Sequence, residues 1–135
     1  MCTRCEDKTM KLNKPTYITL TLIYIALLAY FSVRPPVGHE GTNAARQMFY
    51  NMMHIPAYAG LAFLILRCFG KNNFKVYISS FIIVILVSVF FEYLQSFVPG
   101  RFASMSDVLL NVVGAVVGMR LSAVSFQLTA NRKKQ

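Results

Sequence analysis

The segment from residue 91 to residue 111 sets five polar side chains among long apolar runs. They are two carboxylates, two amides and one guanidinium: Glu92, Gln95, Arg101, Asp107 and Asn111. Carboxylates transfer protons or bind cations, amides orient polar groups, and a guanidinium binds phosphate or carboxylate through two parallel hydrogen bonds. Because an ionisable group at membrane depth costs about 2.5–3.5 kcal/mol on insertion scales, such residues are candidates for function. We therefore predict a polar site in this region.

The spacing of these residues predicts that they gather at one end of a helical assembly. Glu92 and Gln95 are three apart and Asp107 and Asn111 are four apart, so each pair shares a helix face. Pro99-Gly100 lies between the two pairs, where proline ends a helix and glycine permits a turn. The structural alternatives are a helix-capping role for Asp107 and a simple ion pair between Glu92 and Arg101.

His54 is a further candidate, at the start of another apolar segment. Pro56 follows two residues later, as is typical of the first turn of a helix; if the helix instead begins near Phe49, Pro56 kinks it. A lone histidine is often a hydrogen-bonded structural residue. The two nearby carboxylates also make His54 a candidate general base.

Four apolar segments must position these residues. They span Tyr17–Val33, Ile55–Phe69, Val76–Val98 and Val108–Leu128. A spanning helix needs about 20 mostly apolar residues, and none of the segments alternates with the period of two expected for a membrane β-barrel. We predict an all-α membrane protein: a compact bundle of four transmembrane helices over residues 17–128, with basic tails at 1–16 and 129–135. Gly114 and Gly118 form a small-xxx-small stripe that favours close helix packing.

Composition and charge support a membrane protein with a defined orientation. The chain is 56% hydrophobic, with mean hydropathy +0.49 and net charge +9. Ten basic residues fall in the tails and the second connection, namely Arg4, Lys8, Lys11, Lys14, Arg67, Lys71, Lys75, Arg132, Lys133 and Lys134. Only Arg34, Arg46 and Arg101 fall in the first and third connections. The positive-inside rule then predicts that both termini are cytoplasmic and the polar site extracytoplasmic. We interpret the net charge as topology and contact with anionic lipid, not as nucleic-acid binding.

Two blocks of sequence resemble the VanZ-like family of small bacterial membrane proteins. The first is Met53-His54-Ile55-Pro56-Ala57-Tyr58-Ala59-Gly60-Leu61. The second is Glu92-Tyr93-Leu94-Gln95, Pro99-Gly100-Arg101, Asp107 and Asn111-Val112-Val113-Gly114. The family pattern is a histidine with an Ala-Tyr pair, then Glu-x-x-Gln, Pro-Gly-Arg and Asp-x-x-x-Asn-x-x-Gly. The resemblance covers about residues 50–118. Many relatives carry Asp-Lys shortly before the histidine, where this chain has Tyr50-Asn51.

The resemblance implies a multi-pass protein of the bacterial cytoplasmic membrane with four spans. It adds Tyr58 to the candidate site. The founding member of the family is associated with reduced susceptibility to the lipoglycopeptide teicoplanin. The resemblance supplies no reaction.

Three classes of function fit these observations. The first is an enzyme acting on an anionic or envelope-precursor lipid head group, with His54, Glu92 and Asp107 catalytic and Gln95, Arg101, Asn111 and Tyr58 binding substrate. The second is a non-catalytic binding or scaffold module at the same face, and the third is a small lipid transporter. The expected partners are membrane lipids, such as a phosphorylated lipid or a cell-wall precursor. No cofactor or metal is assigned, although carboxylates could hold a hard divalent cation. The oligomeric state is not encoded in any pattern.

Overall fold

The chain folds as an all-α protein. The computed structural model describes residues 13–34, 51–70, 73–99 and 105–132. Within these residues there are four helices: α1 (Lys14–Ser32), α3 (His54–Phe69), α4 (Phe74–Gln95) and α5 (Met105–Arg132). Three of them, α1, α4 and α5, are long and apolar enough to cross a membrane.

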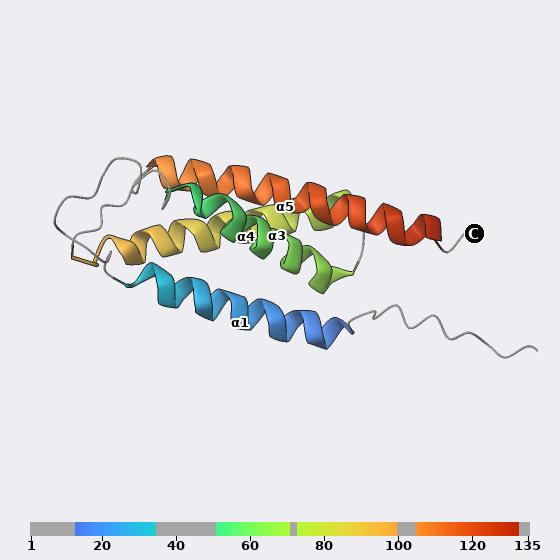
Figure 1. Ribbon diagram of the computed structural model, residues 1–135, viewed down its shortest axis with the longest axis horizontal. Coiled ribbons are helices and arrows are strands. Elements are labelled where there is room, and N and C mark those ends of the chain that lie inside the picture. Colours follow the sequence, from blue (N-terminus) through green and yellow to red (C-terminus); the bar gives the residue numbers. More distant parts are fainter. Residues whose placement is uncertain (1–12, 35–50, 71–72, 100–104, 133–135) are drawn as a thin grey trace, which may run out of the picture.

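The four helices run in alternating directions, with α3 between the others (Figure 1). α3 contacts α1, α4 and α5, and within the described helices α1 has no close contact with α5. One end of the assembly therefore contains the ends of α1 and α4 and the beginnings of α3 and α5. We call this the site end. The described chain begins and finishes at the opposite end.

Local signals explain where α3 ends and α4 begins. Gly70 takes a left-handed conformation with φ 61° after the last turn of α3, which a glycine adopts without steric cost. The side chain of Asn73 then accepts a hydrogen bond of 2.9 Å from the backbone N–H of Val76. This is an N-cap, so α4 begins within a few residues of the end of α3.

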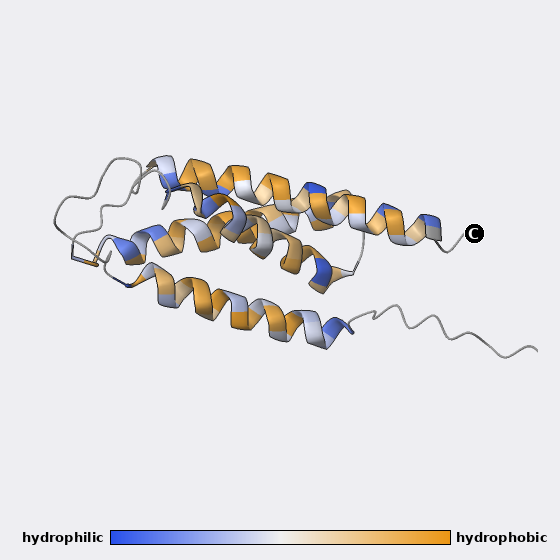
Figure 2. Cartoon of the chain, in the orientation of Figure 1, coloured by the Kyte–Doolittle hydropathy of each residue, from blue (hydrophilic) through white to orange (hydrophobic). Residues whose placement is uncertain are grey.

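Helix α4 has an inverted pattern, with polar residues inside and apolar residues outside. Its buried residues include Ser80, Ser88, Glu92 and Gln95, whereas Leu86, Phe90 and Tyr93 are more than half exposed. Figure 2 shows the hydrophobic outer surfaces of the helices and the hydrophilic residues at the end of α4 and the start of α5. Such exposure of large apolar side chains suits a lipid environment, not water.

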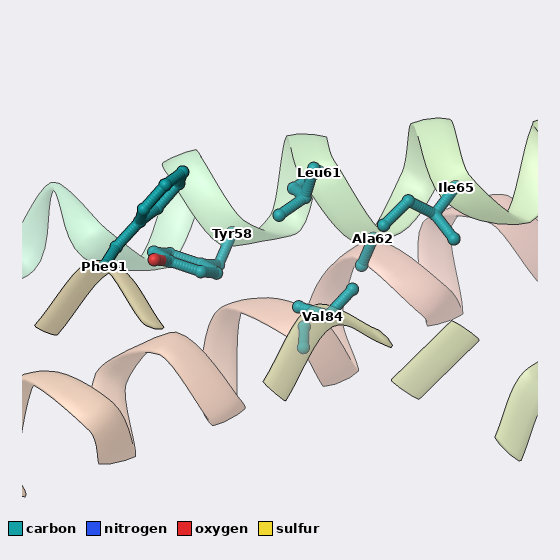
Figure 3. Packing of buried hydrophobic residues seen from close by; sticks show 7 residues of the cluster. Tyr58, Leu61, Ala62, Ile65, Val84 and Phe91 are labelled. Atoms are coloured by element: carbon teal, nitrogen blue, oxygen red, sulfur yellow. The ribbon is translucent and has the colours of Figure 1, made fainter. Parts of the chain in front are cut away.

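The apolar core lies between α3 and α4 (Figure 3). Leu61, Ala62 and Ile65 of α3 pack near Val84 of α4, and Tyr58 lies near Phe91. Tyr24 of α1 donates a hydrogen bond of 2.9 Å to the backbone carbonyl of Ala57. This bond ties the outer helix α1 to α3.

Helix α5 packs directly against the backbone of α3. A Cβ atom added at Gly114 would collide with the carbonyl oxygen of Ile55, and one added at Gly118 would collide with that of Ala59. The two glycines therefore permit an approach that no larger residue allows.

Three of the four predicted spans are long apolar helices, and the remaining one is shorter than expected. α3 has 16 residues, which at 1.5 Å per residue gives about 24 Å, less than the roughly 30 Å of a bilayer core. Asn51 and Met52 are helical, but a turn at Met53 separates them from α3, and Gly70 closes the other end. The start near Phe49 falls outside the described residues.

Candidate functional site

Three helix ends bring the predicted polar residues together. His54 opens α3, Glu92 lies in the last turn of α4, and Asp107 lies in the first turn of α5. One donor atom from each, a ring nitrogen or a carboxylate oxygen, lies within 4.8 Å of the other two. We call these three residues the triad.

A chain of hydrogen bonds through Ser88 and Asn111 fixes the orientation of the His54 ring. Asn111 on α5 is fully buried, and its amide nitrogen donates to the Ser88 hydroxyl at 2.7 Å. The Asn111 side-chain oxygen therefore faces His54 Nδ1, 2.9 Å away, and because this oxygen can only accept, Nδ1 carries the proton. The other ring nitrogen, Nε2, is left with the lone pair.

Tyr58 packs on the other side of this chain. Its ring is stacked on that of His54, with the centroids 6.4 Å apart and the planes 8° from parallel. Tyr58 is 4% exposed, and its hydroxyl lies close to Ser88 and Glu92. Ser88 thus lies beside both Tyr58 and Asn111, the two residues that contact His54.

The two carboxylates have different electrostatic surroundings. Asp107 lies where the positive end of the α5 dipole favours a negative charge, whereas Glu92 lies where the α4 dipole disfavours one. Glu92 is 6% exposed, and one Asp107 oxygen is buried without a hydrogen-bond partner among the described residues. Two ionised carboxylates within 4.8 Å of each other repel by about 3.5 kcal/mol or more at an effective dielectric constant of about 20. A cation bound between the two carboxylates would relieve this repulsion.

Two further predicted site residues remain, of which the structure describes Gln95 but not Arg101. Gln95 is buried one turn beyond Glu92 on the same helix, and it does not belong to the triad. Arg101 lies outside the described residues, so its expected pairing with Glu92 stays a prediction. The roles assigned to all seven candidates likewise stay predictions.

Sequence reasoning missed Ser88, which holds the Asn111 amide. The sequence does indicate a shared position for Ser88 and Glu92. One face of α4 carries a residue every four positions, namely Ser80, Val84, Ser88 and Glu92. All four side chains are buried. A serine one turn before a buried carboxylate was thus a candidate for the same cluster.

An apolar groove of roughly 500 Å³ lies on the α3–α5 seam, lined by Ile55, Pro56, Ala59, Gly60, Phe63, Leu64, Val117 and Leu121. Phe63 is nine residues from His54, which is half a turn around the helix at 3.6 residues per turn. The groove therefore lies on the face of α3 away from the triad. We exclude it from the site.

The arrangement can bind a cation or transfer a proton. An oriented imidazole with a free Nε2 is suited to act as a base or a metal ligand. The adjacent carboxylates can accept hydrogen bonds or supply oxygen ligands. The fold and this cluster define a small multi-pass membrane protein with a polar site buried among its helix ends.

The chain belongs to the VanZ/LLP1 family, whose model matches residues 8–126. This match covers all four described helices except the last residues of α5, and it confirms the resemblance drawn from the two motif blocks. Comparison with curated proteins and with solved structures found no match.

Proposed function

We propose that this protein binds the anionic head group of an envelope lipid at the triad, on the extracytoplasmic side of the bacterial cytoplasmic membrane. The observation that carries the proposal is the convergence of His54, Glu92 and Asp107 from three different helices at one end of an apolar assembly. Polar groups buried at membrane depth are costly and rarely kept without use. The orientation rests on the ten-to-three distribution of basic residues.

The position of the cluster suits an amphiphilic ligand. It lies at the ends of α3, α4 and α5, where a lipid head group can enter while its chains stay beside the apolar outer surfaces. Arg101 follows α4 by six residues and supplies the guanidinium that phosphate recognition requires. Phosphate is therefore the head-group chemistry that we propose.

Replacement of Arg101 by lysine tests this proposal. Lysine keeps the positive charge but loses the planar pair of donors, so we expect Arg101→Lys to fold normally and to bind phosphatidic acid about tenfold less tightly, the equivalent of about 1.4 kcal/mol. The measurement is retention of phosphatidic acid against phosphatidylcholine by purified full-length protein in nanodiscs. Arg120→Lys is the matched control, because Arg120 is exposed on α5, about 22 Å along that helix from Met105.

The proposal fails if the wild-type protein does not prefer phosphatidic acid, or if Arg101→Lys and Arg120→Lys behave alike. A turnover assay on the same lipid then separates an enzyme from a binding module. An enzyme converts the lipid and loses turnover when His54 is replaced by glutamine, whereas a binding module has no turnover to lose. A change in teicoplanin susceptibility on expression of the wild-type protein but not of Arg101→Lys would extend the proposal to the glycopeptide phenotype.

A further inference from the structure

We propose that His54, Glu92 and Asp107 bind one divalent transition-metal cation of the Mn²⁺ or Zn²⁺ class. The proposal begins from one imidazole and two carboxylates that three different helices bring together. Carboxylates attract a divalent cation, and all three side chains can act as its ligands.

The distances are compatible with a single ion. Donor atoms at about 2.1 Å from such an ion lie about 3.0–3.5 Å from one another. The three donor atoms of the triad are already within 4.8 Å of one another. The donor atoms must approach one another by about 1.8 Å or less, which side-chain rotation can supply without movement of the helices.

The ligand types select the class of cation. Imidazole favours Zn²⁺ and similar transition metals, whereas carboxylate also suits Mn²⁺. A site for Ca²⁺ or Mg²⁺ is normally built from oxygen ligands alone, so one nitrogen with two carboxylates argues against both. The triad contains no thiolate, which argues against Cu⁺.

The surroundings of His54 resemble the second shell of a metal site. A metal-binding histidine almost always donates its other N–H to a carboxylate, carbonyl or water, which fixes the ring and its tautomer. The Asn111 side-chain oxygen holds His54 Nδ1 in this way at 2.9 Å, and Ser88 in turn holds Asn111 at 2.7 Å. This support is independent of the carboxylates and leaves Nε2 as the ring nitrogen with a lone pair.

Three protein ligands leave at least one coordination position open. We assign this position to a phosphate oxygen of the lipid, an assignment that rests on the function proposed above. Without an ion, the two carboxylates would repel a phosphate. With an ion between them, the same residues would attract it.

Mn²⁺ binding to the full-length protein in detergent tests the cation site, because free Mn²⁺ has an electron paramagnetic resonance signal that is lost on binding. Cys2→Ser and Cys5→Ser are introduced throughout to keep the tail thiols from binding metal. We expect one Mn²⁺ per chain, displaced by Zn²⁺. Each of His54→Gln, Glu92→Gln and Asp107→Asn should weaken binding more than about 100-fold, since even an outer-shell change costs 10- to 100-fold.

Glu6→Gln is the matched control, because it also removes one carboxylate but lies before α1, which begins at the opposite end of the assembly. It should bind Mn²⁺ like the parent. No saturable binding by the parent, or equal binding by Glu6→Gln and Glu92→Gln, would overturn the proposal.

Thermal stability distinguishes a lost ligand from a misfolded variant. Without metal, the parent, Glu92→Gln and Glu6→Gln should each unfold in a cooperative transition, which shows that the variants are folded. With Mn²⁺, only the parent and Glu6→Gln should gain stability. A gain in stability with Mn²⁺ that is as large for Glu92→Gln as for the parent would overturn the proposal.

Phosphatidic acid in the nanodisc separates the two proposals. If both hold, Mn²⁺ increases retention of this lipid by the parent but not by Glu92→Gln. If Mn²⁺ binds to the triad while retention stays unchanged, the cation site holds and the phosphate assignment fails. If the parent prefers phosphatidic acid and loses this preference in Arg101→Lys, while no saturable Mn²⁺ binding is found, head-group binding holds and the cation site is wrong.

Discussion

At the scale of single residues, the buried amide of Asn111 controls the state of His54. It contacts His54 Nδ1 on one side and the Ser88 hydroxyl on the other. An aspartate at this position would add a third negative charge, whereas an amide orients the ring without one. Any chemistry that uses Nε2 therefore depends on Asn111, which holds the other ring nitrogen, Nδ1.

We predict that Asn111→Leu, which keeps the branching at Cγ but removes both polar atoms, releases the His54 tautomer. The free energy of unfolding in detergent should fall by about 1 kcal/mol, because two buried hydrogen bonds are lost. Nitrogen NMR on ¹⁵N-histidine in a His39→Gln background, where His54 is the only histidine, should show one protonated Nδ1 in the parent and a mixture of tautomers in the variant. An unchanged spectrum would contradict the orienting role.

At the scale of helices, the site depends on how closely α5 approaches α3. Gly114 lies against Ile55, the neighbour of His54, and Gly118 lies against Ala59 one turn further on. The obstacle that an added methyl group would meet is backbone, which cannot rotate away. The spacing between these helices therefore sets the distance between His54 and Asp107.

We predict that Gly118→Ala lowers the free energy of unfolding by about 1–3 kcal/mol through overpacking, although alanine favours a helix over glycine. Gly114→Ala should be similarly destabilising. It should also weaken Mn²⁺ binding, because the added methyl group would displace the backbone of Ile55, the residue after His54. Chemical unfolding in mixed micelles measures the first effect and the paramagnetic assay the second.

Gly60→Ala is the control for these variants. The methyl group added there meets the end of the Tyr24 side chain, which can swing aside at the cost of its bond to Ala57. It should be less destabilising than Gly118→Ala. Equal losses of unfolding free energy at positions 60 and 118 would mean that the close approach of α5 to α3 does not determine stability.

At the scale of the whole molecule, the orientation of the assembly decides which side of the membrane the triad serves. The described chain begins and finishes at the end opposite to the triad. Basic residues are concentrated in the tails and the second connection, which predicts that this opposite end is cytoplasmic.

Single-cysteine labelling in a cysteine-free background tests this orientation. An impermeant maleimide applied to intact cells should label a cysteine at position 101 and should label one at position 71 only after the membrane is permeabilised. Labelling at 71 but not at 101 would reverse the orientation and place the triad on the cytoplasmic side.

The helical class, the family and the candidate site residues could all be predicted from the amino-acid sequence. The long apolar runs exclude other membrane architectures, because every backbone group must be hydrogen-bonded within lipid. The spacing of Glu92 with Gln95 and of Asp107 with Asn111 is local, so each shared face could be predicted within one helix. The stripe of Gly114 and Gly118 likewise predicted close packing but not its partner.

The packing of the helices brings His54 close to Glu92 and Asp107, and it also places Asn111 between the histidine ring and Ser88. None of these contacts could be predicted from the sequence. The tertiary structure also showed α3 to be shorter than a full span and central among the helices. These features depend on the rotation and longitudinal position of each helix relative to its neighbours. Contacts between α3 and α5, far apart in the sequence, set those quantities, and the periodicity of a single helix carries no information about them.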